Sequence, residues 1–325
     1  LEYEVSLGLG GAPQRDLLRF TDPISQHTLA LRSDITGQVG RIAGTRLAGQ
    51  ARPLRLCYAG PVLRVKGDQL SPARERMQAG AELIGDDGEA AAAEVLDTAV
   101  AALKATGIKG LSLDLTMPSL VAELAAAGWT LGRASLGQVQ ALLDGKDAGA
   151  LAALGAGAFV PLIAAAGPAP AALAALGGLA LPAAVQARLA LLARLVAGLG
   201  AAHPDVGVTL DPTERHGFEY QTWLGFSLFG AGIAGEVGRG GAYRLDTPAG
   251  AEAAIGFSLY VDGLVDAGLG LGSARRILLP AGTAPMVAAG LRTQGWQTVA
   301  LLAGDGRAQD YRCGWRWDGT QPVPA

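Results

Sequence analysis

Two stretches in the first quarter of the chain decide its fold: Arg55-Leu-Cys-Tyr-Ala-Gly-Pro-Val-Leu-Arg64 and Arg74-Glu-Arg-Met-Gln-Ala-Gly-Ala-Glu-Leu-Ile-Gly85. The first stretch predicts two strands, Arg55–Tyr58 and Pro61–Val65, separated by a break at an Ala-Gly pair. The second predicts one strand over Arg76–Ile84. A polar, basic loop joins the two stretches, so together they form a hairpin.

Three polar side chains of this hairpin stand at a spacing that places them on one sheet face: Arg64, Gln78 and Glu82. An arginine binds a carboxylate through a two-pronged fork, and a carboxylate accepts hydrogen bonds from an amine or an imidazole. The set therefore suits a zwitterionic amino acid. A solvated hairpin with surface charge explains the same residues, with Glu82 as an acid at a strand end.

The elements outside the hairpin follow in an order typical of an α+β fold. Strands are predicted at Glu2–Leu7, Leu17–Thr21, Thr28–Leu31, Leu111–Leu115, Val206–Leu210, Gly217–Phe229, Ala242–Leu245, Ala254–Ser258, Arg276–Leu279 and Thr298–Leu302. Helices are predicted at Thr36–Ala43 (with Asp34 as N-cap), Glu89–Ala105, Pro118–Ala127, Tyr260–Leu269, Ala284–Gln294 and, broken by prolines, Leu136–Leu199. Because the strands come in antiparallel-looking groups, we predict an antiparallel sheet flanked by helices rather than a doubly wound parallel sheet.

The composition of the 325 residues excludes several protein classes. With 26 basic against 29 acidic residues, no broad surface for nucleic acid is expected. Two cysteines, Cys57 and Cys313, and three scattered histidines predict neither a disulfide framework nor a metal site, and a reduced, cytoplasmic protein is the simplest interpretation. Residues 148–187 carry no charge and are long enough to span a membrane, but prolines interrupt them, which favours short helices on a core.

One glycine pattern, Gly230-Ala-Gly-Ile-Ala-Gly235, fits the fingerprint of dinucleotide-binding sites. That fingerprint requires a helix to begin at the glycines, yet three more glycines follow at Gly238, Gly240 and Gly241. Since the chain has 48 glycines, chance matches are expected. We predict a glycine-rich turn over Gly230–Gly241 and no cofactor.

The hairpin resembles motif 2 of class II aminoacyl-tRNA synthetases, in its histidyl version. Other segments resemble that family in the same order: Leu31-Arg-Ser-Asp-Ile-Thr36, His216-Gly-Phe-Glu-Tyr220, and Gly240-Gly-Ala-Tyr243 followed by a motif 3-like segment over residues 254–264. The resemblance covers residues from about 15 to 270. It implies a class II synthetase-like core over residues 1–272, with a helical insertion at about 136–204. Residues 273–325 would be a short β-α-β tail in place of an anticodon-binding domain.

The resemblance also implies a histidine pocket. In it, Asp34 and Thr36 meet the amino group, Arg64 and Gln78 hold the carboxylate end, and Glu82 accepts from the imidazole. The implied histidine-binding set is completed by Glu219, Tyr220 and Tyr243. A core position for Tyr220 and a turn position for His216 remain open alternatives.

Four positions depart from a working synthetase. Gly263 stands where motif 3 carries the arginine that grips the ATP phosphates, and His216, next to Arg215, stands where an arginine promotes adenylate formation. Gln221 replaces the second tyrosine of the histidine-specific motif, and Ala242 replaces the arginine of the GGRYD motif. Losing these cations removes the charge stabilisation that adenylation needs, so no catalytic residues are predicted.

A catalytically silent chain of this kind resembles the regulatory subunits of ATP phosphoribosyltransferase, the first enzyme of histidine biosynthesis. That resemblance implies no activity alone, a homodimer through the core, and a hetero-octamer with the short-form catalytic subunit. It also implies allosteric feedback inhibition by L-histidine, with no tRNA, membrane, metal or cofactor. Two alternatives stay open: a histidyl-tRNA synthetase-like enzyme that activates histidine with ATP, and a small-molecule sensor for another partner.

Overall fold

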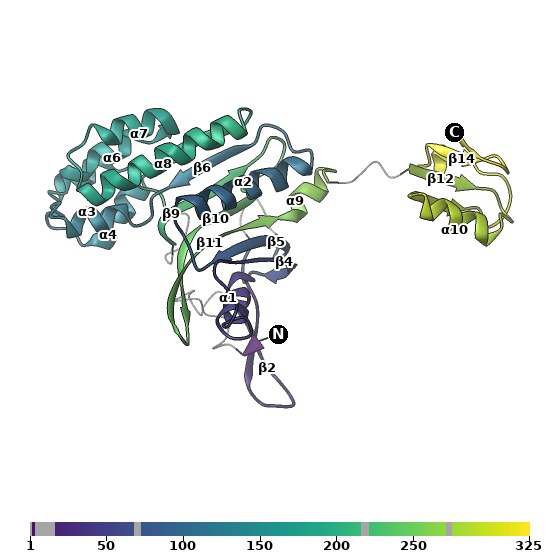
Figure 1. Cartoon of the computed structure of the whole chain (residues 1–325), viewed down its shortest axis with the longest axis horizontal. Helices are drawn as coiled ribbons and strands as arrows, with labels where there is room; N and C mark the ends of the chain where they lie inside the picture. The colour runs from purple at the N-terminus through teal and green to yellow at the C-terminus, as the bar shows by residue number, and fades with distance from the viewer. Residues whose placement is uncertain (1, 4–16, 68–72, 216–220, 271–274) are drawn as a thin grey trace. The chain divides into compact units, whose positions relative to one another are not determined.

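The computed structural model describes residues 2–3, 17–67, 73–215, 221–270 and 275–325, which divide into two compact units, Leu1–Leu269 and Gly270–Ala325 (Figure 1). The strands of the first unit are β1 Glu2–Tyr3, β2 Leu18–Thr21, β3 Thr28–Leu31, β4 Leu54–Leu63, β5 Glu75–Ile84, β6 Ser112–Thr116, β7 Gly167–Pro168, β8 Gly207–Asp211, β9 Gln221–Phe229, β10 Gly238–Thr247 and β11 Gly250–Tyr260. Its helices are α1 Thr36–Gly44, α2 Glu89–Ala105, α3 Leu120–Ala126, α4 Leu136–Asp144, α5 Ala148–Ala153, η3 Gly157–Phe159, α6 Val160–Ala164, α7 Ala169–Gly177, α8 Ala183–Ala202 and α9 Val261–Asp266.

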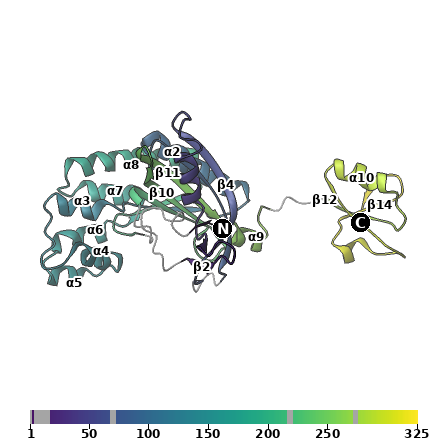
Figure 2. The same ribbon diagram turned by 90° about the horizontal axis from the view of Figure 1, so that it is seen from below.

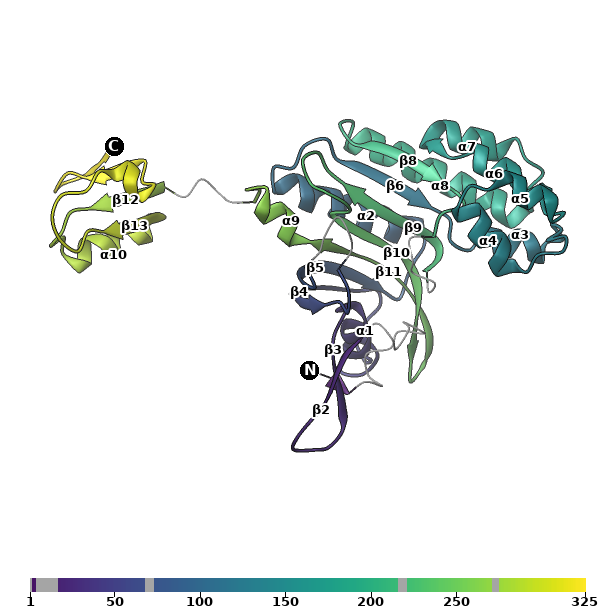
Figure 3. The ribbon, with the colours of Figure 1, turned by 180° about the vertical axis from the view of Figure 1, so that it is seen from behind.

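An eight-stranded sheet forms the body of the first unit, in the order β4-β5-β11-β10-β9-β6-β8-β7 (Figure 3). Neighbouring strands are antiparallel except for β6 and β8, which run parallel. A separate three-stranded sheet, β1-β3-β2, lies near the start of the chain. An antiparallel sheet with helices on its faces is the α+β architecture that the order of elements predicts.

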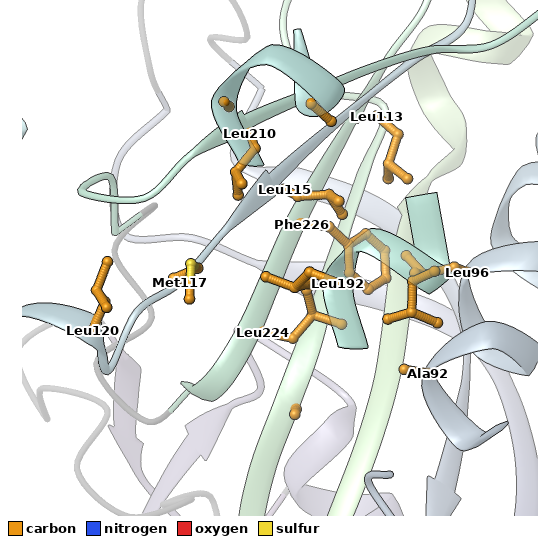
Figure 4. Packing of buried hydrophobic residues seen from close by; sticks show 14 of the residues in the cluster. Ala92, Leu96, Leu113, Leu115, Met117, Leu120, Leu192, Leu210, Leu224 and Phe226 are labelled. Atoms are coloured by element: carbon orange, nitrogen blue, oxygen red, sulfur yellow. The ribbon is translucent and has the colours of Figure 1, made fainter. Parts of the chain in front are cut away.

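Helix α2 covers one face of this sheet and begins and ends where the sequence predicts. Its buried residues recur every three or four positions, which gives the helix a continuous apolar side. Two residues after the helix ends at Ala105, the left-handed Gly107 turns the chain, with a φ of +87°. Figure 4 shows this side meeting the sheet and α8. The core there includes Ala92, Leu96, Leu113, Leu115, Leu192, Leu224 and Phe226.

Helices α3 to α8 gather at one end of the first unit (Figures 1 and 2), and the uncharged run consists of short helices, as predicted. Strand β7 is the one element within residues 148–187 that the sequence did not predict. Helix α8 is long and apolar enough to cross a membrane by length and composition alone. It packs against α2 and α7, while Arg188 pairs with Glu123 and Arg194 with Glu89. These contacts account for its apolar side within the protein core.

Two predicted turns are wrong. The break at Ala59–Gly60 does not exist, because β4 runs unbroken and, as an edge strand, tolerates Pro61, which lacks an N–H donor. The turn predicted over Gly230–Gly241 ends early, since β10 begins at Gly238. A Cβ on Gly240 would lie 2.2 Å from the Gly256 carbonyl oxygen, so glycine there serves close strand contact. A strand follows the glycine pattern where a dinucleotide site needs a helix.

The second unit contains the predicted β-α-β segment, with β12 at Arg275–Leu279, α10 at Pro285–Thr293 and β13 at Trp296–Ala300. Two short strands escaped prediction, β14 (Trp315–Trp317) and β15 (Pro322–Pro324), because three residues are too few to show alternation. The sheet order is β13-β12-β14-β15. Its core includes Trp296 and Trp315, whose rings meet edge-on with centroids 5.3 Å apart.

Candidate functional site

A row of three glycines crosses the middle of the large sheet on the face that bears α1. Strand register places Gly256 beside Gly241 and Gly241 beside Gly225. Glu82 continues this glycine row on one side and Thr116 on the other. Because glycines carry no side chain, the row forms a shallow channel into which longer side chains from either end can lie.

The polar ends of two side chains, Glu82 and Gln221, lie in that channel. A Cβ on Gly256 would stand 1.8 Å from Glu82 Oε2, so the Glu82 carboxyl lies directly over this glycine. A Cβ on Gly241 would stand 2.7 Å from Gln221 Nε2, and one on Gly225 would stand 2.5 Å from Gln221 Oε1. The Gln221 amide therefore covers the other two glycines, and its Nε2 donates to the Gly240 carbonyl at 2.8 Å.

Glu82 is the most enclosed charged residue of the site, with 3% of its surface exposed, so a surface acid at a strand end is the wrong interpretation. Its Oε1 accepts from Thr36 Oγ1 at 3.0 Å and from the Tyr58 hydroxyl at 3.3 Å, and its Oε2 accepts from the Tyr243 hydroxyl at 2.8 Å. Burial outweighs these bonds and raises the pKa of the Glu82 carboxyl to about 8. The group can therefore exchange a proton near neutral pH.

A second network fixes the start of α1 against the sheet. Gln78 Nε2 donates to Asp34 Oδ2 at 2.9 Å and to Ser258 Oγ at 2.6 Å, while its Oε1 accepts from the Ile35 backbone N–H at 3.1 Å. Asp34 Oδ1 accepts from the Thr36 backbone N–H at 2.6 Å. Asp34 thus satisfies the N–H of Thr36, the first helical residue, but the N-cap position is held by Ile35 and not by Asp34 as predicted.

These residues enclose a small pocket. Its lining consists of Asp34, Thr36, Glu82, Gln221, Arg239, Gly240, Gly241, Tyr243, Gly256, Phe257 and Ser258. The open volume is about 20 Å³, which is room for about one water molecule. An amino acid would enter only if lining side chains moved. Among the described residues of the lining, Asp34 and Glu82 are acidic and Arg239 is basic.

The structure brings together five of the eight residues predicted to bind histidine: Asp34, Thr36, Gln78, Glu82 and Tyr243. Arg64 is not among the residues that line the pocket, and its guanidinium stands 5.5 Å from the centre of the Tyr260 ring. The remaining two, Glu219 and Tyr220, lie outside the described residues, as does His216.

Three residues of the site were missed by the sequence analysis: Tyr58, Ser258 and Arg239. Tyr58 and Ser258 both stand opposite Gly80, in β4 and β11 respectively, and their hydroxyl oxygens are 2.8 Å apart. The predicted break in β4 hid the alternation that would have placed Tyr58 on the pocket face. Arg239 was hidden because the glycines around it predicted a turn rather than a strand.

Within the described part of the chain, the positions that depart from a working synthetase supply no cation to the pocket. Gly263 lies in α9, where a Cβ would meet Ile233 Cγ2 at 3.0 Å. Ala242 is fully buried in the main core. Arg215, the neighbour of the missing arginine position, pairs with Asp144 of α4 at 3.4 Å and is not part of the pocket lining.

The chain is similar to known proteins in sequence and in fold. A family model described as Histidyl-tRNA synthetase matches residues 1–264. The ATP phosphoribosyltransferase regulatory subunit of Rhodospirillum centenum is 46% identical, over 98% of this chain and 84% of the relative.

Two solved structures share the fold. One, an ATP phosphoribosyltransferase regulatory subunit/histidyl-tRNA synthetase from Bacillus halodurans, has a TM-score of 0.77 at 24% identity and covers 95% of this chain and 84% of its own. The other belongs to an ATP phosphoribosyl transferase complex from Thermotoga maritima, with a TM-score of 0.60 at 18% identity, covering 79% of this chain and 89% of its own. The predicted histidyl-tRNA synthetase-like fold is thereby confirmed.

Proposed function

The chain belongs to the family of ATP phosphoribosyltransferase regulatory subunits, which have a histidyl-tRNA synthetase-like fold, and from this premise we propose how it works. It is inactive alone, activates the short-form catalytic subunit in the first step of L-histidine biosynthesis, and passes feedback inhibition by histidine to that subunit. Regulation of this kind is a coupling free energy between the histidine pocket and the partner's active site.

One observation supports the proposal: the residues expected to bind the amino acid are present, whereas the cation expected to bind the ATP phosphates is replaced by glycine. Glu82 retains the hydroxyl donors of Thr36 and Tyr243, while Gly263 stands where motif 3 of a synthetase carries the arginine that grips the ATP phosphates. A pocket of this composition favours binding of an amino acid without its activation, because adenylation needs positive charge on the phosphates.

Further parts of the proposal concern assembly and location. We propose that the core forms a homodimer, and that the dimers join catalytic subunits in a hetero-octamer that binds histidine and no tRNA. The free thiols of Cys57 and Cys313 support a reduced, cytoplasmic location.

Reconstitution tests the function. The short-form catalytic subunit is assayed for ATP phosphoribosyltransferase activity alone, with the purified chain, and with the chain plus increasing histidine. We expect activity to rise on adding the chain and to fall with histidine. Unchanged activity would contradict the regulatory assignment, and histidine-dependent pyrophosphate exchange by the chain alone would identify an activating enzyme instead.

A further inference from the structure

Arg239 stands beside the glycine row, on the pocket side of β10. Along this strand Arg239, Gly241 and Tyr243 alternate and therefore share one face, which is the face where the Tyr243 hydroxyl reaches Glu82. In the register, Arg239 pairs with Ser258 in β11 and with Ser227 in β9. It thus lies one row away from the channel that holds Glu82 and Gln221.

A neighbouring carboxylate fixes the direction of the Arg239 guanidinium. Its Nε donates to Glu236 Oε2 at 2.5 Å, and Glu236 Oε1 accepts from the hydroxyl of Ser227, which is completely buried. The side chains of Arg239 and Glu236 are 23% and 14% exposed. An arginine held this way is oriented before any ligand arrives, so less conformational entropy is lost on binding.

The charges of the pocket are complementary to a zwitterion. Asp34 is an anion at one end, Arg239 is a cation, and Glu82 is a buried carboxyl with hydroxyl partners. A free amino acid presents an ammonium, a carboxylate and a side chain, and these three groups require an anion, a cation and a third polar contact. Each requirement is met by one of the three residues.

Arg64, the residue to which the synthetase resemblance gives the carboxylate, is not among the residues that line the pocket. Its guanidinium lies over the Tyr260 ring at 5.5 Å from the centroid, and Arg76 lies 5.3 Å from the same centroid. The Tyr260 ring is 8% exposed, so these two arginines are engaged with a buried aromatic group. Neither lines the pocket.

We propose that Arg239, oriented by Glu236, binds the carboxylate of the amino-acid ligand and thereby selects free amino acids over their decarboxylated or reduced analogues. This inference rests on the proposed binding of histidine in the pocket. It assigns the carboxylate contact to a residue that the synthetase-like motifs do not include.

Calorimetric titration of the full chain with two ligands tests the inference. The ligands are histidine and histidinol, which has an alcohol in place of the carboxylate. Arg239→Gln should weaken histidine binding about 10- to 100-fold, the range for a hydrogen-bonded charge pair. The same substitution should change histidinol binding by less than about threefold, and Arg239→Lys should recover part of the loss for histidine only.

Arg244→Gln is the matched control, since Arg244 is an exposed arginine on the same strand, and Arg64→Gln tests the competing assignment. Equal weakening of both ligands by Arg239→Gln would overturn the inference, because a purely structural role does not depend on the carboxylate. A histidine-specific loss in Arg64→Gln, with none in Arg239→Gln, would overturn it too. If the unsubstituted chain binds no histidine, the proposed function itself fails; if it binds and Arg239→Gln binds equally well, only this inference fails.

Discussion

The two ends of the pocket differ in how their residues are held. At the amino-acid end, Glu82 and Gln78 are buried and bonded to partners from α1, β4, β10 and β11. At the phosphate end, Gly263 stands at the position of the motif 3 arginine and has no polar side-chain group. Side chains that hydrogen-bond to several strands and helices stabilise both the fold and the ligand site. An arginine that contacts only a phosphate contributes to the reaction alone. Recognition and activation are therefore separable parts of one pocket.

The difference also appears in the cost of replacing each residue. Removing Glu82 would take away the acceptor that three hydroxyls share, and losing a hydrogen bond to a buried group costs about 1–3 kcal/mol. Tyr58 would keep its contacts with Ser258 Oγ and the Phe257 carbonyl. Gly263 has no side chain to leave unsatisfied, and a Cβ added there would meet Ile233 Cγ2 at 3.0 Å. Substitution therefore costs more free energy at Glu82 than at Gly263.

The largest effect is expected for Glu82→Ala. Because the carboxyl is the shared acceptor of the network and the proposed contact for the imidazole, histidine affinity should fall about 100-fold or more. Histidine inhibition of the reconstituted complex should weaken in parallel. Glu94→Ala is the control, because Glu94 forms a half-exposed ion pair with Arg55 and should leave histidine binding unchanged. An inhibition curve unchanged by Glu82→Ala would show that this pocket is not the sensor.

A smaller effect is expected for Gly256→Ala, which tests the glycine row. The added Cβ would lie 1.8 Å from Glu82 Oε2 and 2.7 Å from the Ala81 carbonyl oxygen, so side chain and backbone must both shift. We expect a loss of about 2 kcal/mol in the free energy of unfolding. Gly198→Ala in α8 is the matched control: its Cβ would meet nothing within 4 Å, and it should stabilise by about 0.5–1 kcal/mol. Equal changes in the free energy of unfolding for the two variants, measured by urea titration, would contradict the close packing of Glu82 over Gly256.

The pH dependence of stability tests the buried state of Glu82. Burial raises the pKa of Glu82 from its usual 4.5 to about 8, so between these values the folded chain holds a proton that the unfolded chain has lost. Glu82 therefore makes stability fall as pH rises through this window, by at most about 1.4 kcal/mol per pH unit. Glutamine cannot titrate, so the free energy of unfolding of Glu82→Gln should rise relative to that of the unsubstituted chain between pH 5 and pH 8. Urea titrations at each pH measure this difference. Parallel curves would mean that Glu82 is ionised throughout.

The same contrast governs what could be predicted from the sequence. The amino-acid end was largely predictable, because Gln78 and Glu82 alternate along one strand and Asp34 precedes a helix, and local periodicity carries such information. Tyr58 and Arg239 were not predictable in the same way. Their neighbours Gly60-Pro61 and Gly238–Gly241 are typical of turns, and only pairing with adjacent strands makes these segments extended.

The assignment of Arg64 shows a second limit. Periodicity places a residue on a face but does not say where along that face a long side chain ends. Arg64 follows the last residue of β4, and its guanidinium lies over the Tyr260 ring at 5.5 Å from the centroid. Contacts of this kind join residues nearly 200 positions apart in the chain, so they become visible only in the folded structure.

The smallest effect is expected for Gly263→Arg, which places the missing cation back at the phosphate end. Arginine is favoured over glycine in a helix by less than about 1 kcal/mol, and the close approach to Ile233 offsets part of this gain, so stability should change by less than about 0.5 kcal/mol. We expect no histidine-dependent pyrophosphate exchange in this variant, because His216 still stands at the position of the arginine that promotes adenylate formation and Arg215 remains paired with Asp144. Exchange assays with ATP, histidine and labelled pyrophosphate measure this directly, with the unsubstituted chain as the control. Pyrophosphate exchange regained through this one substitution would show that the rest of the activation machinery is intact. A single residue would then separate this chain from an enzyme that activates histidine.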